Sequence, residues 1–181
     1  MVGIQCCQNP SDLSLSSGSG HVEEIGGLQS YVSGSSDSKL GILLVSDAFG
    51  YEAPNLRNLT DKVAAAGFYV VVPDFFHGDP YTTTGDKDVW VWLESHGTDV
   101  GTENAKTVIE ALKDTGISAV GAAGMCWGGK VVGELAKSDD LKAIVMMHPG
   151  LVTVDDIKEI KVPISMLGAE VDEASPPELV K

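Results

Sequence analysis

The stretch "GAAGMCWGGK", residues 121–130, decides how the rest of this sequence is interpreted. Two short motifs overlap in it. Gly124, Gly129 and Lys130 have the spacing of a phosphate-binding loop, G-x-x-x-x-G-K-[ST], but Val131 stands where that motif needs a hydroxyl group to hold magnesium. The same stretch also contains G-x-C-x-G, the turn that presents a nucleophile between a strand and a helix.

The flanking residues favour the nucleophile turn. "ISAVGAA" is typical of a buried strand before Cys126, and "KVVGELAK" is typical of a helix after it. Gly124 and Gly128 lie two residues on either side of the cysteine, where Cβ atoms would clash in so tight a turn. The positive end of the following helix would favour a thiolate, and the backbone N–H of Trp127 would face an oxyanion. The structural alternative is a small buried cysteine packed beneath a glycine turn.

Strands and helices alternate along the chain. Continuous apolar runs predict strands at residues 41–47, 68–74, 117–124, 142–149 and 162–170, and amphipathic patterns predict helices at 53–67, 102–116 and 128–138. We expect Thr102 to cap the second helix and Gly116 to end it. Residues 21–40 predict an antiparallel hairpin with its turn around Gly34 to Asp37. The order predicts an α/β fold with a mainly parallel, doubly wound sheet.

The predicted domain covers residues 21–181, and the Ser- and Gly-rich residues 1–20 predict a flexible lead-in. A net charge of −14 argues against nucleic acid or an anionic membrane surface as a partner. No run approaches the roughly 18 apolar residues of a membrane helix, and the N-terminus lacks the pattern of a secretory signal. Three cysteines, an odd number, argue against a disulfide framework, so we expect a cytoplasmic protein.

Several polar side chains follow the predicted strands. Ligands of parallel sheets bind at the carboxyl ends of the strands, which leads us to expect the following residues to converge there: Asp47, residues 74–77, Cys126, His148 and residues 170–172. The long segment 78–101 separates two of these elements. Its Trp90 and Trp92 could line a pocket or anchor the segment to the core.

A nucleophilic thiol needs a base, and the base needs an acid to orient it. In this architecture the chain order is nucleophile, acid, histidine. Asp172 follows the strand "ISMLGAE", where the acid should be, and Glu170 is the alternative acid. No histidine occurs in "EASPPELVK", the nine residues that follow Asp172.

These residues resemble the dienelactone hydrolase family of α/β-hydrolases, the carboxymethylenebutenolidase-like proteins. The resemblance covers about residues 23–181 and rests on "VSDAFG", "VVVPDFFHG", "GMCWGG", "KAIVMMHPG" and "MLGAEVDEASP". Plant members described as endo-1,3;1,4-β-D-glucanase-like are especially similar, through "QCCQNP", "EEIGGLQSYVSG" and "YEAPNLR".

The resemblance implies hydrolysis of ester or lactone bonds by a Cys–Asp–His triad, without a cofactor or metal. Cys126 would be the nucleophile and Asp172 the acid, and the N–H groups of Trp127 and Ala48 would form the oxyanion hole. Asp47 stands where the family commonly has a Glu that contacts the resting thiol, although Asp is one methylene shorter.

The resemblance also sets expectations about the substrate and the end of the chain. From their positions after predicted strands, His77 and His148 are expected to line the substrate or to have structural roles, in preference to serving as a substitute base, and Trp90 is expected to line the substrate. The Arg with which the family binds a substrate carboxylate is not matched, because His77 and Gly78 stand there. Family members continue through a further strand, a histidine loop and a closing helix. We therefore expect a C-terminally short chain with weak or no turnover, and an exposed sheet edge that favours self-association.

Three other functions remain open at this point. The chain could be a non-catalytic binding or vestigial module that keeps the turn without the chemistry. A nucleotide hydrolase would need the phosphate loop that Val131 disrupts. A glucanase would need two carboxylates across a sugar cleft, for which Asp47 and Asp172 are the candidates.

Overall fold

The structure is a computed structural model that describes residues 18–84 and 88–172. Its elements, in chain order, are β1 (His21–Ile25), β2 (Leu28–Ser33), β3 (Leu40–Val45), α2 (Pro54–Ala64), β4 (Tyr69–Pro73), α3 (Val89–Leu93), α4 (Thr98–Asp114), β5 (Ala119–Met125), α5 (Trp127–Leu135), β6 (Ile144–Met147), α6 (Val154–Lys158) and β7 (Ile164–Leu167). Strands and helices alternate through most of this order, as the sequence predicts.

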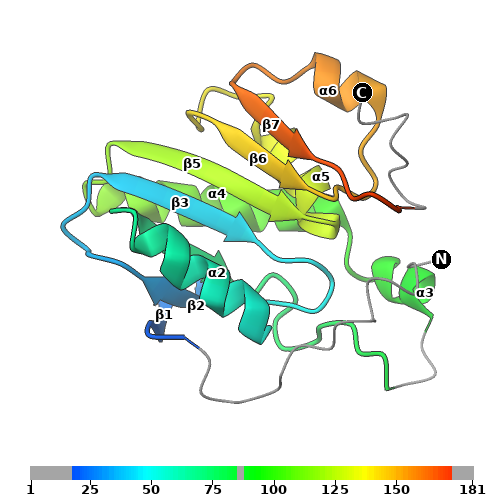
Figure 1. The fold of residues 1–181 in the computed structure, drawn as a ribbon, viewed down its shortest axis with the longest axis horizontal. Coiled ribbons are helices and arrows are strands. Elements are labelled where there is room, and N and C mark those ends of the chain that lie inside the picture. Colours follow the sequence, from blue (N-terminus) through cyan, green and yellow to red (C-terminus); the bar gives the residue numbers. More distant parts are fainter. Residues whose placement is uncertain (1–17, 85–87, 173–181) are drawn as a thin grey trace.

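The strands form one sheet in the order β1-β2-β4-β3-β5-β6-β7 (Figure 1). The five strands from β4 to β7 in this order are parallel, whereas β2 is antiparallel to β1 and to β4. The predicted fold class is therefore confirmed: a mainly parallel sheet with an N-terminal antiparallel hairpin. β5 lies between β3 and β6, and the three strands are parallel. The residues that follow these strands therefore meet at the carboxyl end of the sheet.

Helices cover both faces of the sheet (Figure 1). One face packs against α4 and α5, which supply buried residues such as Val108, Leu112 and Val131 to the larger core. The other face packs against α2, whose Leu56 joins Leu44 of β3 in a smaller core. Burying the strands on both faces explains why their sequences are apolar runs without polar alternation.

Two predicted boundaries are wrong. The hairpin turns at Gly26 and Gly27, both with positive φ, and not around Gly34 to Asp37. Helix α4 begins at Thr98 after the N-cap Gly97, so Thr102 lies within the helix and does not cap it. The Thr102 hydroxyl donates to the Thr98 carbonyl 2.8 Å away. A threonine side chain can cap the start of a helix or donate to a backbone carbonyl within the helix. The sequence alone therefore does not distinguish a threonine at the N-cap from one in the next turn.

The predicted lead-in, residues 1–20, lies mostly outside the described residues. Just before β1, the Ser19 N–H donates to the Asp61 carboxylate on α2 at 2.7 Å. The Gly20 N–H donates to the Tyr31 hydroxyl on β2 at 2.8 Å. The start of β1 is therefore tied to its neighbours in the fold.

An ion cluster joins α5 to α6. The buried carboxylate of Asp156 accepts from Lys130 at 2.7 Å and from Lys137 at 3.1 Å, both on α5. It also accepts from the N–H and hydroxyl of Thr153, each at 2.8 Å, which caps α6. Lys130, the lysine of the rejected phosphate loop, thus holds α6 and the approach to β7 against α5.

We expect Asp156→Asn to lower the free energy of unfolding at pH 7 by about 1.5–3 kcal/mol, the range for hydrogen bonds to a charged group. Burial alone would raise the pKa of Asp156, but the hydrogen bonds from Lys130, Thr153 and Lys137 hold that pKa well below its usual range. The carboxylate therefore stabilises the fold above the ordinary Asp pKa of about 4, and this contribution is lost as the pH falls toward the folded pKa.

Urea unfolding followed by circular dichroism at pH 7 and at pH 3 measures this difference. The matched control is Asp155→Asn on the same helix, whose exposed carboxylate pairs with Lys158. Equal losses of stability in the two variants at pH 7 would contradict the proposed role of the cluster.

Candidate active site

Cys126 occupies a sharp turn between β5 and α5. Its backbone has φ 49° and ψ −111°, in a region that residues other than glycine rarely adopt. The turn is closed by a hydrogen bond of 2.9 Å from the Gly129 N–H to the Cys126 carbonyl. This strained strand-to-helix geometry is the one expected of a nucleophile elbow.

The two glycines that flank the turn have no room for a side chain. A Cβ on Gly124 would overlap the backbone of Gly128, and a Cβ on Gly128 would lie 2.5 Å from the Val45 carbonyl oxygen and 2.7 Å from that of Ser46. Strand β3 thus presses directly on the start of α5. Both positions therefore require glycine, as expected from the sequence, and the contact with β3 adds a second reason at position 128.

Trp127 anchors the start of α5 in the core. Its ring is buried, packs edge to face on Phe76 at a centroid distance of 4.9 Å, and donates from Nε1 to the His96 carbonyl at 2.9 Å. Because Trp127 is the first residue of α5, its backbone N–H has no acceptor within the helix. That N–H is where the sequence places one donor of an oxyanion hole.

The segment after β6 wraps around Cys126. The Cys126 N–H donates to the Met147 carbonyl at 3.2 Å, and the Gly150 N–H donates to the Cys126 carbonyl at 2.9 Å. A Cβ built on Gly150 would lie 3.6 Å from the Cys126 Sγ. Between these contacts His148 takes a positive φ of 37°.

Asp47 and Ala48 follow β3, on the opposite side of β5. The Asp47 carboxylate accepts from the Phe49 N–H at 2.9 Å, and the Ala48 carbonyl accepts from the Tyr81 N–H at 2.8 Å. Burial raises the pKa of Asp47, while the Phe49 N–H and the charge of His148 oppose that rise.

Asp172 and Glu170 follow β7, the strand beside β6. Both therefore follow the carboxyl end of a parallel strand, as Cys126 does. Glu170 is exposed and Asp172 is half-buried. Of the two, Asp172 is thus the less solvated carboxyl group.

His77 and Trp90 lie on other elements than the turn, the first after β4 and the second on α3. His77 follows β4, is exposed, takes a positive φ of 51°, and has its Nε2 3.5 Å from the Asn104 amide nitrogen on α4. Trp90 is on α3 with 52% of its surface exposed. The structure therefore places neither side chain against the residues around Cys126 by a contact among the described ranges 18–84 and 88–172.

The anchor of segment 78–101 is Trp92, one of two residues that the sequence left open for this role. Its ring is buried, stacks on His96 at 4.1 Å, and donates from Nε1 to the Asp79 carbonyl at 3.0 Å. Sequence reasoning missed the helix α3 that positions it. The missed signal is a helical spacing of Val89, Trp92 and Leu93 after Asp88, whose carboxylate caps the helix.

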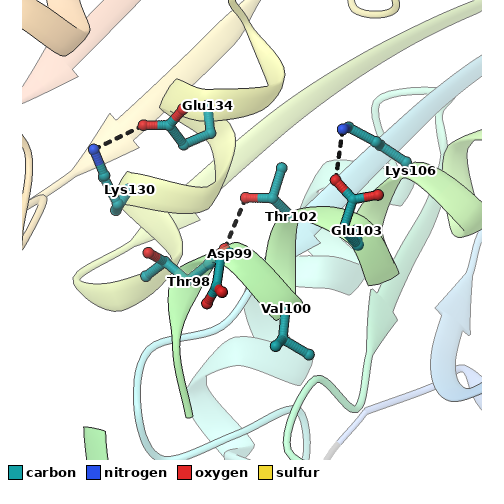
Figure 2. A pocket seen from close by; sticks show the side chains of 8 residues that line it. All are labelled: Thr98, Asp99, Val100, Thr102, Glu103, Lys106, Lys130 and Glu134. Carbon is teal, nitrogen blue, oxygen red and sulfur yellow. Dashed lines mark hydrogen bonds and ion pairs between the residues drawn. The ribbon is translucent and has the colours of Figure 1, made fainter. Parts of the chain in front are cut away.

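A cavity of about 610 Å³ opens between α4 and α5, and Cys126 is not among the residues that line it (Figure 2). Its lining includes the ion pairs Lys106–Glu103 and Lys130–Glu134, each within one helix. The lining contains no cysteine or histidine. Cys126, the N–H groups at the start of α5 and the segment that carries His148 lie instead at the carboxyl ends of the strands, and we take that region as the candidate active site.

Neither metal nor membrane features define the site. Across residues 18–84 and 88–172, no three His, Cys, Asp or Glu side chains are grouped so that they could hold a metal ion. Over the same part of the chain, no helix is both long and apolar enough to cross a bilayer.

A parallel sheet with helices on both faces and a cysteine at a strand-to-helix elbow defines an α/β-hydrolase fold. Solved structures with this fold include a putative dienelactone hydrolase from Klebsiella pneumoniae, with a TM-score of 0.70 and 18% identity over 84% of this chain and 71% of that one. A predicted hydrolase from Thermoplasma acidophilum gives a TM-score of 0.66 at 16% identity, covering 88% of this chain and 77% of that one.

The model of the dienelactone hydrolase family matches residues 28–181, and the chain belongs to that family. A carboxymethylenebutenolidase homologue from Mus musculus is 30% identical over 90% of this chain and 69% of its own length. A protein from Zea mays named endo-1,3;1,4-β-D-glucanase is 46% identical over 97% of this chain. The chain spans 59% of the length of that maize protein.

We expect Gly128→Ala to destabilise the protein by about 1–3 kcal/mol, because the added methyl group overpacks the contact between α5 and β3. Urea unfolding measures the change, and Gly27→Ala is the control. A Cβ at Gly27 meets nothing within 4 Å but φ there is 84°, so this control measures backbone strain without overpacking, whereas Gly128 is not among the glycines with positive φ. Unchanged stability of Gly128→Ala would show that the turn is not tightly packed.

Proposed function

We propose that this protein hydrolyses ester or lactone bonds of small molecules, with Cys126 as the nucleophile. The observation that carries the proposal is the strained backbone of Cys126 at the junction of β5 and α5, which is retained in a chain of the dienelactone hydrolase family. A buried structural cysteine has no need of that geometry, because strain of this kind must be stabilised by its surroundings.

The first step is attack by the Cys126 thiolate on the carbonyl carbon of the substrate. A bond forms between sulfur and carbon, and the carbonyl π electrons move onto the oxygen. The Trp127 N–H, at the first position of α5, and the Ala48 N–H, after β3, stabilise this oxyanion. The positive end of α5 also favours the thiolate before attack.

Asp172 is the acid that would orient a histidine base, in the chain order of α/β-hydrolases. All four histidines of the sequence, at positions 21, 77, 96 and 148, precede Asp172. Asp47 is the group that contacts the resting thiol and controls its ionisation. Its half-buried position beside the turn supports this role.

The substrate is a small ester or lactone, and the residues proposed to line it are His77 after β4, His148 after β6 and Trp90 on α3. An uncharged acyl group suits this edge better than a dicarboxylate, because His77 and Gly78 stand where an arginine would bind a carboxylate. No cofactor enters the reaction. We propose that the reaction takes place in the cytoplasm, because three cysteines, an odd number, argue against a disulfide framework.

Self-association through β7 is a further part of the proposal. Among the described residues β7 pairs with β6 on one side only, and its Ile164 and Leu167 are 39% and 54% exposed. An open strand edge with exposed apolar side chains can pair with another copy. Sedimentation velocity, which measures mass in solution, distinguishes a monomer from such an assembly.

We expect Cys126→Ala to reduce kcat/KM for p-nitrophenyl acetate at least about 100-fold, because a covalent step loses its nucleophile. Initial rates of p-nitrophenolate release measure the loss. The control is a Cys6→Ser, Cys7→Ser variant, which keeps Cys126 as its one thiol. Full activity of the Cys126→Ala variant would refute the assignment, and absence of turnover in both proteins would favour the non-catalytic module.

The maize relative supports a second candidate, an endo-1,3;1,4-β-glucanase. Because the two proteins are 46% identical, the activity in the name of the maize protein is an alternative to ester hydrolysis. A glycoside hydrolase needs two carboxyl groups across the sugar, for which Asp47 and Asp172 are the candidates. Release of reducing ends from mixed-linkage β-glucan tests this function, and it should survive Cys126→Ala but not Asp172→Asn.

A further inference from the structure

Both residues of the proposed oxyanion hole are hydrogen-bonded to the same segment, 78–101. The Ala48 carbonyl accepts from the Tyr81 N–H at 2.8 Å. The Trp127 indole Nε1 donates to the His96 carbonyl at 2.9 Å. Tyr81 lies in the first described part of this segment, residues 78–84, and His96 lies in the second, residues 88–101. The segment therefore connects the residue that follows β3 by a few positions with the first residue of α5.

Trp92 joins the two parts of the segment. Its indole Nε1 donates to the Asp79 carbonyl at 3.0 Å, and its ring stacks on the His96 ring at a centroid distance of 4.1 Å and an interplanar angle of 10°. The same ring meets the Tyr81 ring edge to face at 6.1 Å. Trp92 is 1% exposed. One buried side chain thus contacts both residues that are bonded to the oxyanion-hole residues.

The Phe76 ring packs this arrangement against the start of α5. Phe76 follows β4, and its ring is edge to face with Trp92 at 4.8 Å, with His96 at 5.6 Å and with Trp127 at 4.9 Å. Protein interiors have few voids and low compressibility, so a displaced ring moves its neighbours. A change at Trp92 is therefore expected to shift His96, whose carbonyl holds the Trp127 side chain.

We propose that Trp92 is a positioning residue for the oxyanion hole: it holds Ala48 and Trp127 at the spacing that directs both N–H groups to one oxygen atom. This inference rests on the proposed function, in which Cys126 attacks an ester carbonyl and these N–H groups stabilise the oxyanion. Such stabilisation depends on donors that are in place before the reaction, and small displacements of them lower the rate.

Two reactions of Cys126 separate this role from a general effect on the fold. With p-nitrophenyl acetate, sulfur bonds to the carbonyl carbon and the π electrons move onto oxygen. The oxyanion then collapses to a thioester, the bond to the phenolic oxygen breaks, and p-nitrophenolate leaves with that electron pair. With iodoacetamide, sulfur bonds to the methylene carbon and iodide leaves with the electron pair, so no oxyanion forms. Only the first reaction uses the oxyanion hole.

The test measures both rates in the Cys6→Ser, Cys7→Ser background, where Cys126 is the sole cysteine. The initial release of p-nitrophenolate measures acylation, and the loss of free thiol after addition of iodoacetamide measures alkylation. Trp92→Leu removes both the stacked ring and the Nε1 donor, whereas Trp92→Phe keeps an aromatic ring.

Three further variants complete the comparison. Trp127→Phe removes the Nε1 bond to the His96 carbonyl and keeps a ring at that position. Val91→Ala is the control on the same helix, α3, where Val91 is 53% exposed. Leu56→Ala is the control for lost core packing, since Leu56 is buried in the smaller core beneath α2. Circular dichroism identifies a temperature at which the variants are folded.

We expect Trp92→Leu to slow acylation at least about tenfold, a smaller loss than the roughly 100- to 1,000-fold that follows removal of an oxyanion donor. Alkylation by iodoacetamide is unchanged, because the thiol and the helix end beside it are intact. Trp92→Phe restores most of the acylation rate, since a ring again packs on His96. Val91→Ala and Leu56→Ala leave the ratio of the two rates unchanged.

The proposal is overturned if Trp92→Leu slows both reactions equally, as a purely structural role predicts, or slows neither. If Trp92→Leu does not fold, Trp127→Phe decides: a selective loss of acylation supports the proposal, and an unchanged ratio of rates opposes it. Failure of the proposed function gives a different result, namely a parent protein whose release of p-nitrophenolate is absent or survives Cys126→Ala, and that result overturns both proposals.

Discussion

The contact between the start of α5 and the end of β3 governs the geometry of the site. Gly128 has the Val45 and Ser46 carbonyl groups where a Cβ would be, and Gly124 has the Gly128 backbone in the same place. Only with hydrogen at both positions can the chain reverse from β5 into α5 and leave Cys126 at φ 49°. Because the end of β3 is part of this contact, the turn also fixes the position of Asp47 and Ala48, which follow β3.

The remaining parts of the site are built around that turn. The segment after β6 is bonded to both the N–H and the carbonyl of Cys126, and the ring of Trp127 is bonded to the segment that carries His96. The Asp156 cluster secures the connection from β6 to β7 against α5. Each of these hydrogen bonds and ion pairs joins a neighbouring segment to α5 or to Cys126, its N-cap residue. The groups that follow the strands are therefore held in position relative to one short helix.

Local sequence patterns predicted which strands and helices form more accurately than they predicted where each one begins and ends. The apolar runs of β3, β4 and β5 were unambiguous, because strands buried on both faces leave no polar position. The turn of the hairpin was misplaced, because Gly26–Gly27 and the Gly34 region carry equally strong turn residues and pairing decides between them. Trp90 and Trp92 could not be ranked, since both stand in one short helix and only packing shows that Trp92 is the buried one.

The sequence by itself determined the class of fold, the cysteine at a strand-to-helix turn and the family to which the turn points, because these depend on residue type and spacing along the chain. The tertiary structure decided which distant groups meet at that turn. The contacts of the turn with the Ser46 carbonyl after β3 and with the Met147 carbonyl of β6 are of this kind: about eighty and about twenty residues separate these groups from Cys126. Their proximity follows from the order in which β3, β5 and β6 pair, and strand order is a property of the folded sheet.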